Sequence, residues 1–339
     1  MPGQWRRSLT QSTSPGIGLR GCVLVAASAL AASSCGPSAR SRGCTCATPP
    51  CVSDPAAHRA RLELVRAELS TATSGLSGLA RHADGTLFAL PEDHRALLAF
   101  RLDAAGRPGR ITEHALTGIA ADVDTESLAF VGDGLLAVGT ERIEGDSVRG
   151  DEIDVVRVSG ESARVERRLR MPYARWGMHA IENTGLEGMC AASGILLASV
   201  ENPIGEGGRR FAHLGRVAWS GADATRGATW EHFRLWLTSD EGMISSLDCR
   251  PLPDGGGVDV IAVERHFGIA RILRFRVPRE GRGHDITPRV AVDLGCALEE
   301  VPNFEGIVFL DDERVALLTD NDFGGPDGPS QLFVLRLPR

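Results

Sequence analysis

A five-residue pattern that recurs five times constrains the fold more than any other feature of this sequence. Each copy has Ser or Glu at its centre, and the copies occupy residues 75–79, 124–128, 185–189, 243–247 and 303–307. Their central residues are 49, 61, 58 and 60 positions apart. This period is in, or slightly above, the range of propeller blades and excludes solenoids built from short repeats. The repeat therefore predicts a β-propeller.

Each copy is followed by the same succession of apolar segments. A short strand and a turn lead to a second strand that ends on an acid, at residues 87–92, 135–141, 195–201, 260–264 and 315–320. Two further strands usually follow, as at 97–102 and 111–116, which gives four strands per blade. Near-continuous apolar runs are typical of strands buried on both faces, and 40 glycines supply many tight turns. We therefore expect an all-β propeller of five four-stranded blades, or of six if one long interval hides a degenerate unit.

The two ends of the repeat region predict how the ring is closed. After Asp320 only one strand remains, at residues 331–337, so the last blade lacks its fourth strand. The segment 61–69 precedes the first copy and is positioned to supply that strand. Pairing of the N- and C-terminal strands would remove an open sheet edge.

The N-terminus is typical of a targeting segment. Arginines precede an apolar stretch of about ten residues, which is too short to span a bilayer. The stretch ends in Ala-Ser-Ser-Cys35, which resembles the lipobox of bacterial lipoproteins. We predict a lipoprotein-type signal peptide at 1–34, lipidation of Cys35, a flexible Ser/Pro/Cys tether at 35–60 and the propeller domain at 61–339. The protein is then exported and lipid-anchored to the cell envelope; conventional cleavage would leave it periplasmic or secreted.

Cysteines and charge limit the other partners. Without Cys22 and a lipidated Cys35, six cysteines remain, an even number that fits three disulfides in an oxidising compartment: Cys44, Cys46, Cys51, Cys190, Cys249 and Cys296. Their pairing is left open. A net charge of −7 without a basic stripe argues against a nucleic-acid partner. We expect a monomer that meets the membrane only through its lipid anchor.

Acidic residues recur at two positions in each repeat, and both are expected at the same end of the blade. The first set is Ser77, Glu126, Glu187, Ser245 and Glu305; the second is Glu92, Glu141, Glu201, Glu264 and Asp320. Carboxylates crowded at one channel mouth raise each other's pKa unless a cation neutralises them, and Ca²⁺ takes six to eight oxygen ligands. We predict that Glu126, Glu187, Glu201, Glu264, Glu305 and Asp320 bind Ca²⁺. The alternative for any single acid is that it caps backbone N–H groups of a turn.

Several of these segments resemble the phytase-like domain family, described as having esterase-like activity of phytase. The resemblance runs from about residue 74 to the end, through 75–79, 124–129, 183–188, 244–248, 263–267, 303–307 and 319–323. It implies an exported bacterial propeller that hydrolyses phosphate or other esters, by likeness to calcium-dependent phytases. The family commonly has an acid where this chain has Ser77 and Ser245.

Metal-assisted phosphoester hydrolysis also needs cations that steady the phosphoryl oxygens and a group that protonates the leaving oxygen. Lysine is absent from the chain, so arginine must supply permanent cations. The catalytic candidates are His179 and Arg265, although a loop histidine such as His179 is more often without a catalytic role. The substrate-binding candidates are Arg142, Arg175, Asn202, Asn303 and Asn321.

Three functions fit these observations. The first is a metal-dependent phosphoesterase that acts on a small-molecule ester or phosphate ester. The second is a propeller lactonase, in which Ca²⁺ would be ringed by Glu187, Asn202, Asn303, Glu305 and Asp320. The third is a surface module that binds a ligand without turnover. No Gly-x-Ser-x-Gly or His-Glu-x-x-His motif is present, which disfavours a serine hydrolase or a zinc protease.

Overall fold

The computed structural model describes residues 62–338, except 70, 72, 93, 122, 142, 145–147, 179–184, 202, 221–227, 267–268, 299 and 322–328. All of these residues belong to one compact unit, Ser38–Arg339. The predicted signal peptide, the tether and Cys35 lie outside the described residues. Among the residues that are described, no helix is long and apolar enough to cross a membrane.

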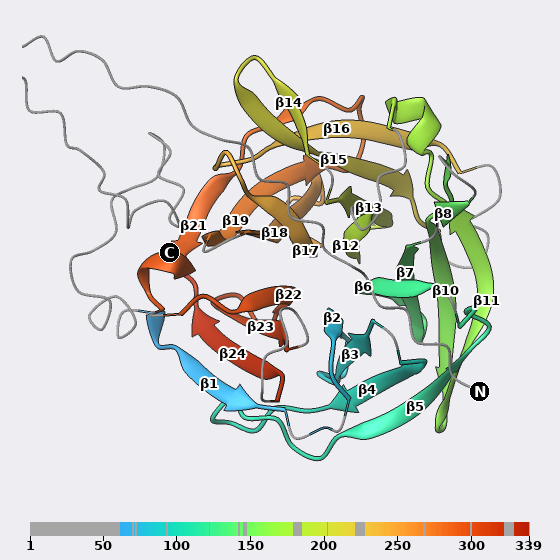
Figure 1. The fold of residues 1–339 in the computed structure, drawn as a ribbon, viewed down its shortest axis with the longest axis vertical. Helices are drawn as coiled ribbons and strands as arrows, with labels where there is room; N and C mark the ends of the chain where they lie inside the picture. The colour runs from blue at the N-terminus through green and yellow to red at the C-terminus, as the bar shows by residue number, and fades with distance from the viewer. Residues whose placement is uncertain are drawn as a thin grey trace, which may run out of the picture. The chain divides into compact units, whose positions relative to one another are not determined.

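The described part is all-β, as expected, and its strands form four-stranded antiparallel runs that each begin with a copy of the pentapeptide (Figure 1). The first run is β2 (Leu76–Arg81), β3 (Leu87–Pro91), β4 (Ala96–Phe100) and β5 (Thr112–Thr117). The second is β6 (Asp124–Gly132), β7 (Leu135–Glu141), β10 (Glu152–Ser159) and β11 (Ser162–Arg170). The third is β12 (Leu186–Ala192), β13 (Ile195–Val200), β15 (Arg209–Ala218) and β16 (Trp230–Trp236). The fourth is β17 (Met243–Pro251), β18 (Gly257–His266), β19 (Ile269–Pro278) and β21 (Arg289–Asp293).

The last run takes its strands from both ends of the repeat region. It contains β22 (Asn303–Phe309), β23 (Arg314–Asp320), β24 (Gln331–Arg336) and β1 (Val65–Glu68). Strand β1 pairs antiparallel with β24, with Val65 opposite Val334. Short additions decorate the runs: β8 (Ile143–Glu144) with β9 (Val148–Arg149), β14 (Ile204–Glu206), β20 (Asp285–Ile286), and the 3₁₀-helices η2 (Tyr173–Trp176) and η4 (Leu294–Cys296).

The first strands of the runs lie at the centre and contact one another in sequence, the architecture of a β-propeller (Figure 1). Strand β2 packs against β6, β6 against β12, β12 against β17, β17 against β22, and β22 against β2. The fourth pentapeptide residue is Gly or Ser because this approach is close. A Cβ atom at Gly306 would lie 2.6 Å from the Cβ of Leu79. A larger residue there would push neighbouring runs apart.

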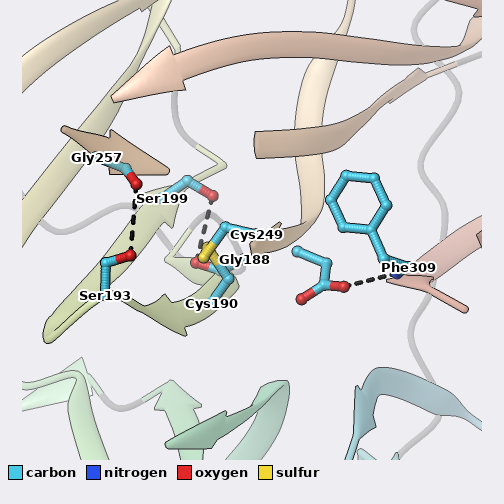
Figure 2. Close-up of a disulfide and its surroundings, with 8 residues drawn as sticks. Gly188, Cys190, Ser193, Ser199, Cys249, Gly257 and Phe309 are labelled. Carbon is cyan, nitrogen blue, oxygen red and sulfur yellow. Dashed lines mark hydrogen bonds between the residues drawn. A yellow bond between two sulfur atoms is a disulfide. The ribbon is translucent and has the colours of Figure 1, made fainter. Parts of the chain in front are cut away.

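A disulfide joins two of the central strands (Figure 2). Cys190 on β12 bonds to Cys249 on β17, with 5.6 Å between their Cα atoms. The two cysteines are 59 residues apart, and closing a loop of that length in the unfolded chain stabilises the fold by about 4 kcal/mol. Cys296 is also disulfide-bonded. One of the pairings that the sequence left open is thereby assigned.

A half-buried carboxylate next to this disulfide links β17 to β22. Asp248 accepts a hydrogen bond of 2.6 Å from the backbone N–H of Phe309 (labelled in Figure 2). Burial raises the pKa of Asp248 to about 7, although backbone hydrogen bonds and the charges of Arg81 and Arg250 oppose the shift. The folded state therefore binds a proton that the unfolded state has released between about pH 4 and pH 7.

We predict that Asp248→Asn makes the stability of the domain less sensitive to pH. Because the folded pKa of Asp248 lies above the unfolded one, the free energy of unfolding of the parent falls as pH rises through this window. Between pH 4.5 and pH 7.5 the variant should gain on the parent by on the order of 2 kcal/mol, allowing for partial exposure of the carboxylate. Urea unfolding at both pH values measures this, and an unchanged difference between the two proteins would contradict it.

Candidate metal centre and active site

The third residue of every pentapeptide copy lies in a β-bulge. The strand register shifts between the second and fourth residues of each copy, so the third has no partner across the strand pair. A bulge redirects the side chain of its extra residue. In two copies this residue is a serine that bonds forward to the next central strand: Ser77 donates to the carbonyl of Thr125 at 2.5 Å, and Ser245 to that of Phe304 at 2.7 Å.

In the other three copies the bulged residue is a buried glutamate, and these glutamates share one electrostatic environment. Burial raises the pKa of Glu126 well above its usual range, and the carboxylates of Glu92, Glu141, Glu305 and Asp124 raise it further. Burial likewise raises the pKa of Glu187, with Glu201, Glu126, Glu305 and Glu141 adding to the shift. We call the set Glu92, Asp124, Glu126, Glu141, Glu187, Glu201, Glu305 and Asp320 the acidic cluster.

Three members of the acidic cluster lie close enough together to hold one ion. Carboxylate oxygens of Glu92, Asp124 and Glu126 all lie within 4.8 Å of one another. Glu92 follows β3, whereas Asp124 and Glu126 begin β6, so two neighbouring runs build the triad. Oxygen donors of this kind suit a hard cation such as Ca²⁺. Of these three residues, only Glu126 is among the ligands predicted from the sequence; Asp124, the first residue of its pentapeptide, is not.

Arg265 provides a largely buried positive charge within the acidic cluster. Its Nη2 donates to Oε1 of Glu305 and lies 3.6 Å from Oε1 of Glu201. Burial would lower the pKa of Arg265, but Glu305, Glu201 and Glu187 raise it above its ordinary value. The Arg265 side chain is 15% exposed, so these charges meet with little screening by water.

Glu305 has an unsatisfied oxygen at the same place. Its Oε2 and the Nε of Arg265 are buried without a hydrogen-bond partner among the described residues. Burial raises the pKa of Glu305 to about 7, even though Arg265 opposes the shift. Asn303 lies beside it and donates from Nδ2 to Glu305 at 2.7 Å and to Asp320 at 3.1 Å. The structure thus brings together Asn303, Glu305 and Asp320.

Other acids of the second set cap turns. Both carboxylate oxygens of Glu264 accept from the backbone N–H of Thr238, at 3.1 and 3.2 Å, and Ser239 donates its hydroxyl to Glu264 at 2.6 Å. Glu141 accepts from the backbone N–H of Gly185 in the next run. These contacts match the capping role that the sequence allowed for a single acid.

Comparison with protein families decides the relationship of this chain. Residues 71–323 match the family model named Phytase-like, described as esterase-like activity of phytase. The chain belongs to the phytase-like family. The match covers most of the described residues and all three residues of the acidic triad. The resemblance seen in the repeated segments is therefore confirmed.

Solved structures also resemble the phytase-like chain, at low sequence identity. They include a putative oxidoreductase (glucose dehydrogenase) from Thermus thermophilus, with 13% identity, a TM-score of 0.46 and coverage of 80% of this chain and 99% of that one. Virginiamycin B lyase from Staphylococcus aureus has 12% identity, a TM-score of 0.38 and coverage of 81% and 99%. The soluble aldose sugar dehydrogenase of Escherichia coli has 10% identity, a TM-score of 0.42 and coverage of 81% and 100%. No curated protein sequence matches the chain.

Of the remaining predicted site residues of the phytase-like domain, two are described by the structure and three are not. Asn321 accepts a hydrogen bond of 3.1 Å from the backbone N–H of Gly75 and so holds the turn into the first repeat. Arg175 lies on η2, whose Trp176 stacks 5.2 Å from the ring of His232 on β16, an outer strand. His179, Arg142 and Asn202 lie outside the described residues.

Proposed function

We propose that this phytase-like protein is a metal-dependent hydrolase of phosphate or carboxylic esters, with its active site at the acidic cluster. The observation that carries the proposal is the triad of Glu92, Asp124 and Glu126, whose oxygens lie within 4.8 Å of one another and of which Glu126 is buried. Two further observations support a cation within the acidic cluster. The pKa of Glu126 is raised by burial and by surrounding carboxylates, and a buried oxygen of Glu305 lacks a described partner. A divalent cation would relieve that repulsion.

In this proposal the triad holds Ca²⁺ and the rest of the cluster orients substrate and moves protons. When bound, the ion supplies positive charge that polarises the ester and favours ionisation of an attacking water. Glu305 accepts the proton of that water at Oε2, while Asn303 and Arg265 fix its other oxygen. The positive charge of Arg265 also offsets the negative charge that develops on the substrate.

A lactonase is the second candidate. Glu305, Asn303 and Asp320, three of the residues that such a site would require, are joined by hydrogen bonds from the Asn303 amide. A lactone is an internal carboxylic ester, so the same charges could serve its opening. Substrate preference therefore distinguishes the two candidates.

The assay that tests the proposal pairs metal with substrate. The purified protein is incubated with Ca²⁺ or with a chelator, against p-nitrophenyl phosphate, phytate, a p-nitrophenyl carboxylic ester and a lactone. We expect Ca²⁺ to stimulate hydrolysis of at least one of them by tenfold or more, because the bound ion would polarise the ester and favour ionisation of the attacking water. Calcium binding without turnover of any substrate would instead identify a non-catalytic binding module.

We also infer the setting in which the site works. The succession of contacts from β2 through β6, β12, β17 and β22 back to β2, together with the pairing of β1 with β24, supports five blades closed by the terminal strands. The sequence of the N-terminus supports export, lipidation of Cys35 and attachment to the cell envelope. We propose that the protein acts there as a monomer on a small-molecule ester.

A further inference from the structure

A groove lined by arginines lies on the fourth run, apart from the acidic cluster. Its volume is about 540 Å³, and its charged lining consists of Arg250, Asp259, Arg274, Arg276, Arg289 and Asp312. The strand register shows why these side chains meet. Arg250 lies opposite Asp259, Asp259 opposite Arg276, and Arg274 opposite Arg289, so β17, β18, β19 and β21 present them on one face.

Two of the arginines are fixed in place. Asp259 accepts two hydrogen bonds from Arg274, from Nε at 2.8 Å and from Nη2 at 2.5 Å. It also accepts one from Nε of Arg250 at 3.1 Å. Asp312 accepts from Nη1 of Arg250 at 3.0 Å. Asp259 thus fixes the positions of the guanidinium groups of Arg250 and Arg274.

The other two arginines are exposed and have no such partner. No ion pair or hydrogen bond joins the side chain of Arg276 or of Arg289 to another described residue, and Arg289 lies directly opposite Arg274. Like charges directly opposite each other on neighbouring strands are destabilising. Four arginines against two aspartates leave unbalanced positive charge in the groove, although the chain as a whole carries −7. An anion bound between these side chains would neutralise the excess positive charge.

We propose that this groove binds a phosphoryl dianion, with Arg276 and Arg289 contacting its oxygens and Arg274 supporting them from below. The planar guanidinium fork matches phosphate oxygens two at a time, and several arginines from different strands can surround a tetrahedral group. The volume of the groove exceeds that of inorganic phosphate, so a phosphate monoester with an organic group fits. The monoester is either a soluble metabolite or the headgroup of a lipid. The site does not depend on the hydrolase proposed above.

Calorimetric titration with inorganic phosphate and with glycerol 3-phosphate tests the site. The whole protein is used at fixed ionic strength with a chelator present, so that the acidic cluster holds no metal. We expect saturable binding to the parent and at least tenfold weaker binding to Arg276→Gln/Arg289→Gln. The matched control is Arg110→Gln, an exposed arginine on another run, which should bind as the parent does. Equal binding by parent and double variant, or equal weakening by the control, would overturn the proposal.

Thermal unfolding gives a second readout that does not depend on measuring affinity. Without phosphate, Arg289→Gln should melt at a higher temperature than the parent because its repulsion with Arg274 is removed. Phosphate should raise the melting temperature of the parent but not that of the variant. A variant that melts lower than the parent and still responds to phosphate would show that the groove is not an anion site.

Vesicle sedimentation distinguishes the two sources of the monoester. Vesicles of phosphatidylcholine, with or without phosphatidic acid, are mixed with the parent or the double variant. A lipid source predicts that the parent sediments only with vesicles containing phosphatidic acid and that the double variant stays in solution. A soluble source predicts binding of glycerol 3-phosphate without sedimentation. If the parent neither binds glycerol 3-phosphate nor sediments with the vesicles, the proposal is overturned.

Discussion

Replacing Arg265 with Met should lower the free energy of unfolding by about 3–5 kcal/mol, the usual cost of removing one partner from a buried ion pair. Arg265 donates to Glu305 and lies 3.6 Å from Glu201, and both carboxylates are less than one-tenth exposed. Met fills much of the same volume, so the loss reports on charge and not on an empty cavity. The measurement is urea unfolding at pH 8 in the presence of a chelator.

A second substitution separates this effect from poor packing. In the Arg265→Met background, Glu305→Gln removes one of the carboxylates left without its counter-charge, so it should recover part of the lost stability. Arg157→Met is the matched control. Arg157 pairs with Glu166 at the surface, where solvent screening leaves an ion pair little effect on stability. If Arg265→Met loses no more stability than Arg157→Met, Arg265 does not neutralise the interior of the acidic cluster.

The strands were largely predictable because the same pattern of turns and apolar runs recurs in all five copies of the repeat. The second strands begin or end within a few residues of their predicted bounds, as β7 does at Leu135–Glu141 and β23 at Arg314–Asp320. Alternating turns and apolar runs determine such strands locally. The segment expected ahead of the first copy likewise contains β1, which pairs with β24.

The roles of individual acids were not predictable, because they depend on bulges and loops that one-dimensional spacing does not show. Glu201 and Glu264 both lie near the end of a second strand, yet Arg265 lies 3.6 Å from Glu201, whereas Glu264 is bound by Thr238 and Ser239. The difference arises from the loop before β17, whose Thr238 and Ser239 donate hydrogen bonds to Glu264. Asp124 escaped notice because the other copies have Gly, Met or Asn at its position.

The pairing of cysteines was hidden for a similar reason. Cys190 and Cys249 are 59 residues apart in sequence, and only the packing of β12 against β17 brings their Cα atoms to 5.6 Å. The same approach of central strands selects the small fourth residue of each repeat. The small fourth residue of the pentapeptide therefore reflects the close contact between blades. The disulfide that this contact permits could be identified only from the three-dimensional arrangement.

The double substitution Asp124→Asn/Glu126→Gln should abolish metal-stimulated hydrolysis and weaken Ca²⁺ binding by at least about 100-fold, since each lost carboxylate removes a charged oxygen ligand. The same change should stabilise the metal-free protein. Burial and neighbouring carboxylates disfavour the charged form of Glu126, and Gln avoids that penalty at neutral pH. Melting temperatures with a chelator and with Ca²⁺, together with calcium titration, measure both effects.

Removing a metal ligand should therefore weaken Ca²⁺ binding while it stabilises the metal-free protein, and this combination distinguishes a metal ligand from a structural acid. A turn-capping acid such as Glu264 should behave differently, because Glu264→Gln weakens hydrogen bonds to Thr238 and Ser239 and so lowers stability with or without Ca²⁺. Glu161→Gln, at an exposed position, should change neither quantity. If the double variant keeps its calcium response while Glu264→Gln loses it, the ion binds nearer to Glu264, and the triad of Glu92, Asp124 and Glu126 is not the metal centre.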